Sequence, residues 1–339
     1  MLQLEDRVAI VTGAARGIGR ATVELLVAAG ARVVAADRDA GELALAVAAH
    51  GDRVEAVVVD LLSPTGPEDL VAAAIDRWGE LDVVVNNAGF TWDAPLHRTD
   101  DDQWDAMLAI HATVPFKVLR AAAPHLREPA KREQAEGVER FRKVVNVTST
   151  SGTMGNATQA NYAAGKAAVV GLTKSLAKEW GPLRINVNAV AFGAIDTRLT
   201  AAQSDDNTTR VGDRDVQLGV PDHLRGMLDM FTPLGRPGTP TEAAGPSLPV
   251  LRARRLRDRP SAHGERRPAA RDVVVTTSPL RPWPTFVVLL IWFVAGDLIG
   301  GVVANRLDLP PLGELAIELV LFGAALAVVF RRLSRDIPT

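Results

Sequence analysis

Residues 7–190 alternate short apolar runs with longer alanine-rich segments, and this alternation constrains the fold more than any other feature of the chain. The longer segments carry apolar residues at helical spacing. The short runs are apolar throughout, which is typical of strands covered on both faces of a parallel sheet. We expect strands at 7–13, 31–37, 53–60, 81–89, 143–149 and 184–191. The pattern predicts an α/β fold built on a doubly wound parallel sheet.

A glycine-rich sequence, TGAARGIG, lies between the first predicted strand and the first predicted helix. Glycines there permit a tight turn and let the backbone approach a pyrophosphate, whose charge is met by amides at the helix N-terminus. A strand, this turn and a helix in succession indicate a Rossmann-like unit that binds a dinucleotide. The candidate cofactor-binding residues of the turn are Gly13, Arg16, Gly17, Ile18 and Gly19.

Asp37 ends the second predicted strand, where a carboxylate accepts hydrogen bonds from the adenosine ribose hydroxyls and repels a 2′-phosphate. It favours NAD as the cofactor over NADP. Arg16 and Arg38 support the alternative, because either guanidinium could hold a 2′-phosphate. Further candidate contacts are Asp60, which either caps the next segment or bonds the adenine, Leu61 beside it, and Asn87, Ala88 and Gly89 in the NNAG run after the fourth strand.

The strongest candidate for chemistry combines Ser149, Tyr162 and Lys166. Tyr162 and Lys166 stand at i and i+4 and therefore share one helix face. A nearby ammonium favours the phenolate, so we expect Lys166 to lower the pKa of Tyr162 and make it a usable acid near neutrality. Tyr162 is the only tyrosine of the chain, which makes its place beside a lysine more informative.

Together, TGAARGIG, NNAG, Ser149 and YAAGK resemble the motifs of the short-chain dehydrogenase/reductase family over residues 4–200, and most closely its 3-oxoacyl-(acyl carrier protein) reductase branch. The resemblance implies an NAD(P)-dependent oxidoreductase that interconverts a ketone and a secondary alcohol. Ser149 would hold the carbonyl oxygen, Tyr162 would protonate it, and Lys166 would bond the nicotinamide ribose and tune Tyr162. Ile195 and Thr197 would face the nicotinamide carboxamide. The implied partner is a small carbonyl or alcohol substrate, with an acyl thioester favoured.

Three features depart from the family pattern. His111 stands where the family commonly has a catalytic asparagine that supports a proton-relaying water, and a histidine that carries protons near neutral pH could keep that relay. The usual proline-glycine after the sixth strand reads Phe192-Gly193. The last helix and seventh strand are interrupted after residue 245, where the run 272–278 offers a substitute strand. Those elements build a subunit interface in the family, so the formation of a homo-oligomer stays open.

The C-terminal part changes character. We divide the chain into a short-chain dehydrogenase/reductase domain (1–245), an Arg/Pro-rich linker (246–280) and an apolar helical hairpin (281–339). Two apolar stretches within 285–330 predict a transmembrane hairpin with both ends in the cytoplasm, because arginines flank its outer ends. Buried core helices are the alternative. A frame shift or gene fusion near residue 245 would explain the abrupt change, and resequencing the source DNA tests it.

Composition limits the remaining possibilities. The chain has no cysteine, which excludes disulfides and thiolate chemistry, and we expect no metal site. A net charge of −2 gives no general reason to expect nucleic acid as a partner. The N-terminus does not read as a signal peptide, so a cytoplasmic catalytic domain is expected, anchored to the membrane by the hairpin. Two alternative functions stay open: another secondary-alcohol or hydroxysteroid dehydrogenase, and a membrane-anchored nucleotide-binding protein without turnover.

Overall fold

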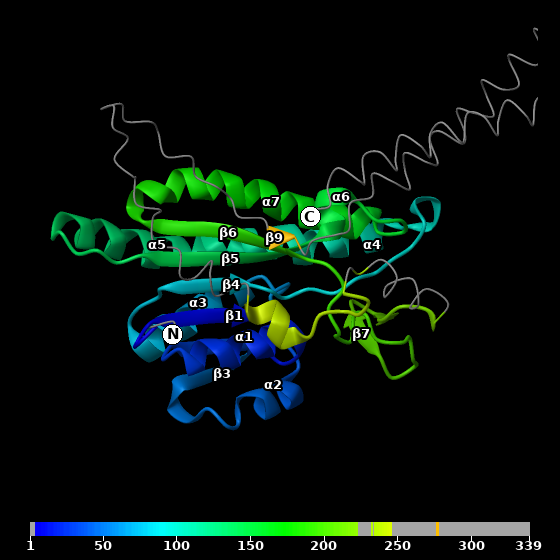
Figure 1. The fold of residues 1–339 in the computed structure, drawn as a ribbon, viewed down its shortest axis with the longest axis horizontal. Coiled ribbons are helices and arrows are strands. Elements are labelled where there is room, and N and C mark those ends of the chain that lie inside the picture. The colour runs from blue at the N-terminus through cyan, green and yellow to red at the C-terminus, as the bar shows by residue number, and fades with distance from the viewer. Residues whose placement is uncertain (1–3, 223–231, 233, 246–275, 278–339) are drawn as a thin grey trace, which may run out of the picture. The chain divides into compact units, whose positions relative to one another are not determined.

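A parallel sheet in the order β3-β2-β1-β4-β5-β6-β9 forms the centre of the protein (Figure 1). The structure is a computed structural model that describes residues 4–222, 232, 234–245 and 276–277. The strands are β1 (Val8–Thr12), β2 (Arg32–Asp37), β3 (Val54–Val58), β4 (Val83–Asn86), β5 (Arg142–Ser149), β6 (Ile185–Phe192) and β9 (Thr276–Thr277). The strand order reverses between β1 and β4, and ligands bind such sheets beside this point, at the carboxyl ends of the strands.

The six strands expected from the apolar runs are all present, and the doubly wound α/β fold is confirmed. Within the run 272–278, which the sequence offers as a substitute strand without favouring it, Thr276–Thr277 form β9 and pair with Val190 and Ala191 of β6. The boundaries predicted at 245 and 280, the linker and the apolar hairpin concern residues outside the described part of the chain, so they stay predictions.

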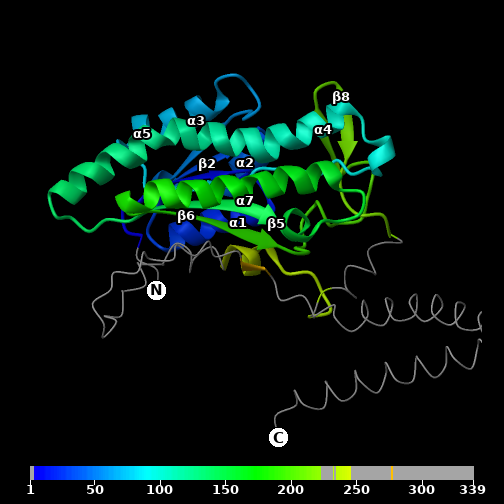
Figure 2. The same ribbon diagram turned by 90° about the horizontal axis from the view of Figure 1, so that it is seen from above.

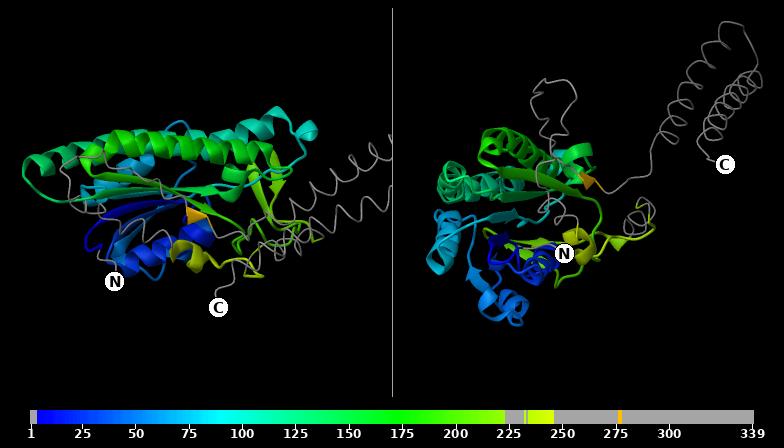
Figure 3. Two further views of the ribbon diagram at one scale, coloured as in Figure 1. Left: turned by 45° about the horizontal axis from the view of Figure 1, so that its top comes forward. Right: turned by 60° about the vertical axis from the view of Figure 1, so that its left-hand side comes forward.

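Helices cover both faces of the sheet, as Figures 1 and 3 show. Along β1, Val8 and Ile10 join one hydrophobic core, whereas Ala9 and Val11 join the other, because successive strand side chains point to opposite faces. The first core is closed by α3 (Gly66–Trp78), α5 (Val114–Ala135) and α7 (Ala160–Trp180), and the second by α1 (Gly17–Ala28) and α2 (Ala40–Val47). This double cover explains why the strands are apolar throughout.

A long helical segment carries three elements in succession. They are α4 (Asp101–Leu108), a π-helical turn (Ala109–Thr113) and α5. The charged segment that begins at residue 127 continues α5 to Ala135. Within the described residues, Asp101–Ala135 is the helix long and apolar enough to span a membrane, yet 44% of its most apolar window is buried inside the protein. It packs against α3 and α7 and belongs to the core (Figure 2).

Shorter elements complete the described fold. Helix α6 (Thr150–Met154) follows β5 directly, and short 3-10 turns occupy Gly51–Arg53, Leu96–Arg98 and Gly181–Leu183. After β6 the chain forms an antiparallel hairpin from β7 (Thr208–Val211) and β8 (Arg214–Gln217). A short helix at 240–245 then packs Ala243 into the second core. It begins with a capping box, because Thr239 Oγ1 accepts from the Glu242 amide while Glu242 accepts from the Thr239 amide.

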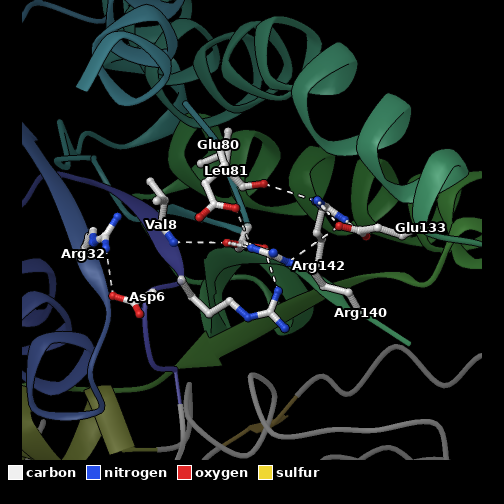
Figure 4. Close-up of polar contacts among 10 residues, drawn as sticks. Asp6, Val8, Arg32, Glu80, Leu81, Glu133, Arg140 and Arg142 are labelled. Atoms are coloured by element: carbon white, nitrogen blue, oxygen red, sulfur yellow. Dashed lines mark hydrogen bonds and ion pairs between the residues drawn. The ribbon is translucent and has the colours of Figure 1, made fainter. Parts of the chain in front are cut away.

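A network of paired charges lies at the amino ends of β1, β4 and β5 (Figure 4). Asp82, whose side chain is 1% exposed, accepts from Arg7 Nη1 at 2.8 Å, from Arg140 Nε at 2.8 Å and from Arg140 Nη2 at 2.7 Å. Arg142 is 2% exposed and donates to both carboxylate oxygens of Glu133. Each of these buried charges therefore has a hydrogen-bonded partner of opposite sign.

Candidate active site

The glycine-rich turn joins β1 to α1 at the carboxyl edge of the sheet. Gly13 and Gly17 adopt φ angles of +66° and +53°, which favour glycine. A Cβ at Gly19 would stand 2.0 Å from the Gly13 carbonyl oxygen, so a side chain cannot fit there. Helix α1 has no side-chain cap and no acidic residue in its first turn. This N-terminus therefore fits the pyrophosphate of a dinucleotide, with Arg16 at the N-cap and Ile18 in the first turn.

The NNAG run supports this turn from the neighbouring strand. Asn87 Nδ2 donates to the carbonyl oxygens of Thr12 at 2.9 Å and of Gly13 at 3.2 Å. The Thr12 hydroxyl in turn accepts from the amides of Asn87 and Ala88. The two segments bind each other tightly, and a Cβ at Gly13 would lie 2.8 Å from Ala88 Cα. Asn87 and Ala88 therefore hold the shape of the glycine-rich turn.

Asp37 ends β2 beside the same turn. Its carboxylate accepts from the amides of Ala15 at 3.1 Å and of Asp39 at 3.1 Å. Arg16 pairs with Asp39 at 2.9 Å and with Glu42, and Arg38 Nη2 donates to Thr209 Oγ1 of the β7–β8 hairpin. Both arginines that the sequence offered for a 2′-phosphate therefore have protein partners.

Ser149 is the last residue of β5 and lies at the carboxyl edge of the sheet. Its Oγ accepts from the Ser151 amide at 3.1 Å, which makes Ser149 the N-cap of α6. The Ser149 hydroxyl also acts on the Tyr162 phenol, whose pKa it lowers by hydrogen bonding. Helix α6 packs closely on α7, because a Cβ at Gly152 would stand 2.6 Å from Lys166 Cβ. The structure thus brings Ser149, Tyr162 and Lys166 together, as the sequence predicted.

Tyr162 and Lys166 lie on one face of α7, and burial dominates the pKa of each. Burial raises the pKa of Tyr162 to about 12, although its hydrogen bond to Ser149 acts in the opposite direction. Burial also lowers the pKa of Lys166 to about 8. The Lys166 ammonium donates to the Val147 carbonyl oxygen at 2.9 Å and lies 5.8 Å from the Tyr162 ring centroid. The expected lowering of the Tyr162 pKa by Lys166 is wrong for the protein alone, because loss of water dominates at the phenol and the Asp93 carboxylate raises the pKa further.

His111 stands in the π-helical turn and is 2% exposed. Its ring lies edge-on to Tyr162 with centroids 4.9 Å apart, and a Cβ at Gly89 would stand 2.4 Å from its Cε1. Nε2 contacts the Phe90 carbonyl oxygen at 2.7 Å; a carbonyl only accepts, so Nε2 carries the proton. Nδ1 is then an acceptor, and it has no partner among the described residues.

Burial, and then the positive charge of Lys166, hold the pKa of His111 well below its usual range. The expectation that His111 carries protons near neutral pH is therefore wrong. The imidazole stays neutral because a second buried cation beside Lys166 would be costly. In place of a proton carrier, the structure provides a buried acceptor next to Tyr162.

The remaining sequence-predicted contacts lie along the same edge. Asp60 Oδ1 accepts from the Leu62 amide at 2.9 Å in the turn before α3, whose N-cap is Thr65, and Leu61 is buried. The adenine contact of Asp60 stays a prediction. Thr197 packs on the glycine-rich turn, because a Cβ at Gly17 would stand 3.2 Å from its Cγ2. Ile195 is buried and pairs with Gly238, which ties the segment after β6 to the capping box of the last described helix.

Sequence reasoning missed Asn161, which is fully buried beside Tyr162. Its Nδ2 donates to the carbonyl oxygens of Trp92 at 3.0 Å and of Gln103 at 3.2 Å, and its Oδ1 accepts from the Tyr162 amide. Asn161 therefore fixes the start of α7 to the loop after β4 and to α4. Its position directly before the only tyrosine, in QANY, was the available signal.

The arrangement defines a dinucleotide-dependent oxidoreductase, because a phenol, a hydroxyl and an ammonium meet beside a pyrophosphate-binding turn. The family model for short chain dehydrogenases matches residues 7–208. The 3-oxoacyl-(acyl-carrier-protein) reductase FabG of Vibrio cholerae is 39% identical over 208 residues, which cover 61% of this chain and 81% of the relative. That of Thermotoga maritima is 35% identical over 246 residues, which cover 72% of this chain and 89% of the relative.

A solved structure of 3-ketoacyl-(acyl-carrier-protein) reductase from Brucella melitensis complexed with NADH is also similar. Its TM-score is 0.61 at 26% sequence identity, over 73% of this chain and 90% of that one. The chain belongs to the short chain dehydrogenase family. It is an NAD(P)-dependent oxidoreductase that acts on CH–OH groups and the corresponding carbonyls.

Proposed function

We propose that the protein reduces 3-oxoacyl thioesters to 3-hydroxyacyl thioesters with NADH. The observation that carries the proposal is the meeting of Ser149, Tyr162 and Lys166 beside the glycine-rich turn, in a chain whose relatives are named 3-oxoacyl-(acyl-carrier-protein) reductases. A bound NADH supplies the hydride for the carbonyl carbon. Ser149 holds the carbonyl oxygen, and Tyr162 gives it the proton that completes the alcohol.

The environment of Tyr162 suits the direction of reduction. A pKa of about 12 keeps the phenol protonated at neutral pH, so Tyr162 holds the proton that the carbonyl oxygen needs, as a weaker acid than an ordinary phenol. Lys166, with a pKa of about 8, lies close enough to neutrality to exchange protons with its surroundings. We assign two roles to Lys166: it hydrogen-bonds the nicotinamide ribose, and it passes a proton back toward Tyr162.

The preference for NAD over NADP rests on Asp37 and on the partners of two arginines. A 2′-phosphate near the Asp37 carboxylate would meet a like charge, whereas ribose hydroxyls can donate to it. Arg16 is engaged by Asp39 and Glu42, and Arg38 is engaged by Thr209. The charge of Arg16 is therefore partly neutralised, and one donor of Arg38 is already used, so both are less able to bind a 2′-phosphate.

His111 takes the place of the family's asparagine as a neutral positioning residue. A buried acceptor without a partner costs roughly 1–3 kcal/mol, which favours a water that donates to Nδ1. Such a water beside Lys166 and Tyr162 would carry protons from solvent to the phenol. The imidazole keeps one tautomer throughout, because Nε2 is committed to Phe90.

Cellular context completes the proposal. We keep the expectation of a cytoplasmic catalytic domain, with a membrane anchor at 285–330 that lies outside the described residues. Assembly into a homo-oligomer is left open, because the elements after residue 245 lie outside them as well, apart from β9. The other secondary-alcohol dehydrogenases and the binding protein without turnover remain the alternatives that an assay must separate.

The test is a turnover assay on the purified full-length chain, with acetoacetyl thioester and a panel of simple ketones, in NADH or NADPH. We expect NADH-dependent reduction of the thioester, and a loss of about a hundredfold or more in Tyr162→Phe with NADH binding unchanged. Reduction of ketones but not of the thioester would favour another secondary-alcohol dehydrogenase. NADH binding without any turnover would favour the binding protein, and no binding would overturn the proposal.

A further inference from the structure

The β7–β8 hairpin packs on the protein through one face. Thr208–Val211 pairs with Arg214–Gln217 in antiparallel register. Thr209 and Val216 face each other across the two strands and are buried, whereas their neighbours in both strands are more exposed. The following residue, Leu218, is 1% exposed and belongs to the first core. The hairpin is therefore a packed element of the domain.

The open end of the hairpin, where β7 begins, contacts residues around Asp37. Arg38, which directly follows Asp37, donates through Nη2 to the buried Thr209 Oγ1. Asn207 Nδ2 donates to the Arg198 carbonyl oxygen at 2.8 Å. The half-buried Arg198 side chain is close enough to Arg16, Arg38 and Asp37 for their charges to affect its pKa. This part of the hairpin therefore contacts the charged residues that surround the ribose-binding carboxylate.

The other end is fixed near the catalytic residues. Arg214 pairs with Asp100 at 2.7 Å and with Asp102 at 3.0 Å, at the start of α4. Its guanidinium also lies 5.6 Å from the centre of the Trp92 ring. Contacts at both ends hold Thr209 in place, so its hydroxyl is a fixed acceptor for Arg38.

We propose that Thr209 is a specificity residue for the dinucleotide, because it withdraws a donor of Arg38 from a 2′-phosphate. The proposal rests on the proposed function, in which Asp37 binds the adenosine ribose. Guanidinium groups recognise phosphates through two parallel hydrogen bonds, so an Arg38 already bound to Thr209 offers a weaker site. The hairpin after β6 thus adds to the NADH preference proposed for Asp37.

Calorimetric titration of the full-length chain with NADH and with NADPH tests this without any turnover. In Thr209→Val, which keeps the strand but removes the acceptor, we expect NADPH to bind about fivefold more tightly and NADH to change less than about twofold. The matched control is Thr208→Val, one position earlier on the exposed face, where both affinities should stay unchanged. Arg38→Gln should cost little NADPH affinity in the parent and should abolish the gain in Thr209→Val.

An unchanged NADPH to NADH ratio in Thr209→Val would overturn the proposal, as would a gain that persists in the double variant Thr209→Val/Arg38→Gln. A parent chain that binds neither nucleotide would instead overturn the proposed function, and with it this inference. Circular dichroism of each variant confirms that the affinities compare folded proteins.

Discussion

The amino ends and the carboxyl ends of the parallel strands, here called the amino edge and the carboxyl edge of the sheet, differ in how their buried ionisable groups are paired. At the amino edge, Asp82 is enclosed by Arg7 and Arg140, and Arg142 holds Glu133. At the carboxyl edge, the described residues include no ion pair with Lys166 or His111, and the Asp93 carboxylate raises the pKa of Tyr162 instead of pairing with a cation there. An ion pair at the carboxyl edge would hold a catalytic group in one protonation state, whereas the proposed reaction needs Tyr162 and Lys166 to lose and regain protons. The difference indicates that the stabilising ion pairs lie at the amino ends of the strands, whereas the reactive groups lie at their carboxyl ends.

The pKa values express the same contrast. Burial alone would raise the pKa of Asp82, but the hydrogen bonds and charges of Arg140 and Arg7 bring it below its usual value. No such partner opposes burial at Lys166, whose pKa falls from 10.5 to about 8. The unfolded chain then binds that proton more tightly, so protonated Lys166 reduces the stability at neutral pH by roughly 3 kcal/mol. The carboxyl edge therefore carries a cost that the amino edge avoids.

The largest expected effect is the removal of Asp82. In Asp82→Ala, two arginines lose their buried partner and the Val8 amide loses its acceptor. We expect the free energy of unfolding to fall by about 3–5 kcal/mol, as measured by urea denaturation. NADH affinity of the folded protein should stay unchanged, because Asp82 lies at the opposite edge from the glycine-rich turn.

Glu55→Ala is the control for this loss, because its partner Arg77 is about as exposed as Glu55 and stands 3.4 Å away. A surface pair of this kind should contribute less than about 1 kcal/mol. Equal losses in Asp82→Ala and Glu55→Ala would remove the contrast between paired burial and surface pairing. A large loss of NADH affinity in Asp82→Ala would show that the two edges are not independent.

A smaller effect is expected at His111. His111→Phe fills a similar volume but removes the Nδ1 acceptor, so turnover should fall about tenfold while KM stays constant. His111→Asn retains an acceptor and should recover most of the rate. The pH profile of the parent should show no limb from a histidine, since burial and Lys166 keep the imidazole neutral. A limb near neutral pH that disappears in His111→Asn would show a titrating imidazole instead.

Much of the fold and the reactive trio could be predicted because their signals are local. Each strand is one apolar run, and Tyr162 and Lys166 share a helix face by spacing alone. The glycine-rich turn is local too, because Gly13 and Gly17 need left-handed backbone angles. These features depend on neighbours in the chain, so they can be predicted without tertiary contacts.

The rest depends on distant contacts. Arg38 meets Thr209 across 171 positions of the chain, and no spacing rule connects them. The π-helical turn that directs His111 toward Phe90 leaves no pattern in the residues. The direction of the Tyr162 pKa was predicted wrongly, because burial is decided by packing and not by the lysine four residues away.

The pKa of Tyr162 is the most direct test of the contrast between the edges. Because Tyr162 is the only tyrosine, the ultraviolet absorbance of tyrosinate reports this one phenol in the unmodified full-length chain. With circular dichroism confirming a folded protein, we predict almost no tyrosinate at pH 10 without cofactor, consistent with a pKa of about 12. Half-titration at pH 10 or below in the folded protein would contradict the account, because burial would then not raise the pKa of the Tyr162 phenol.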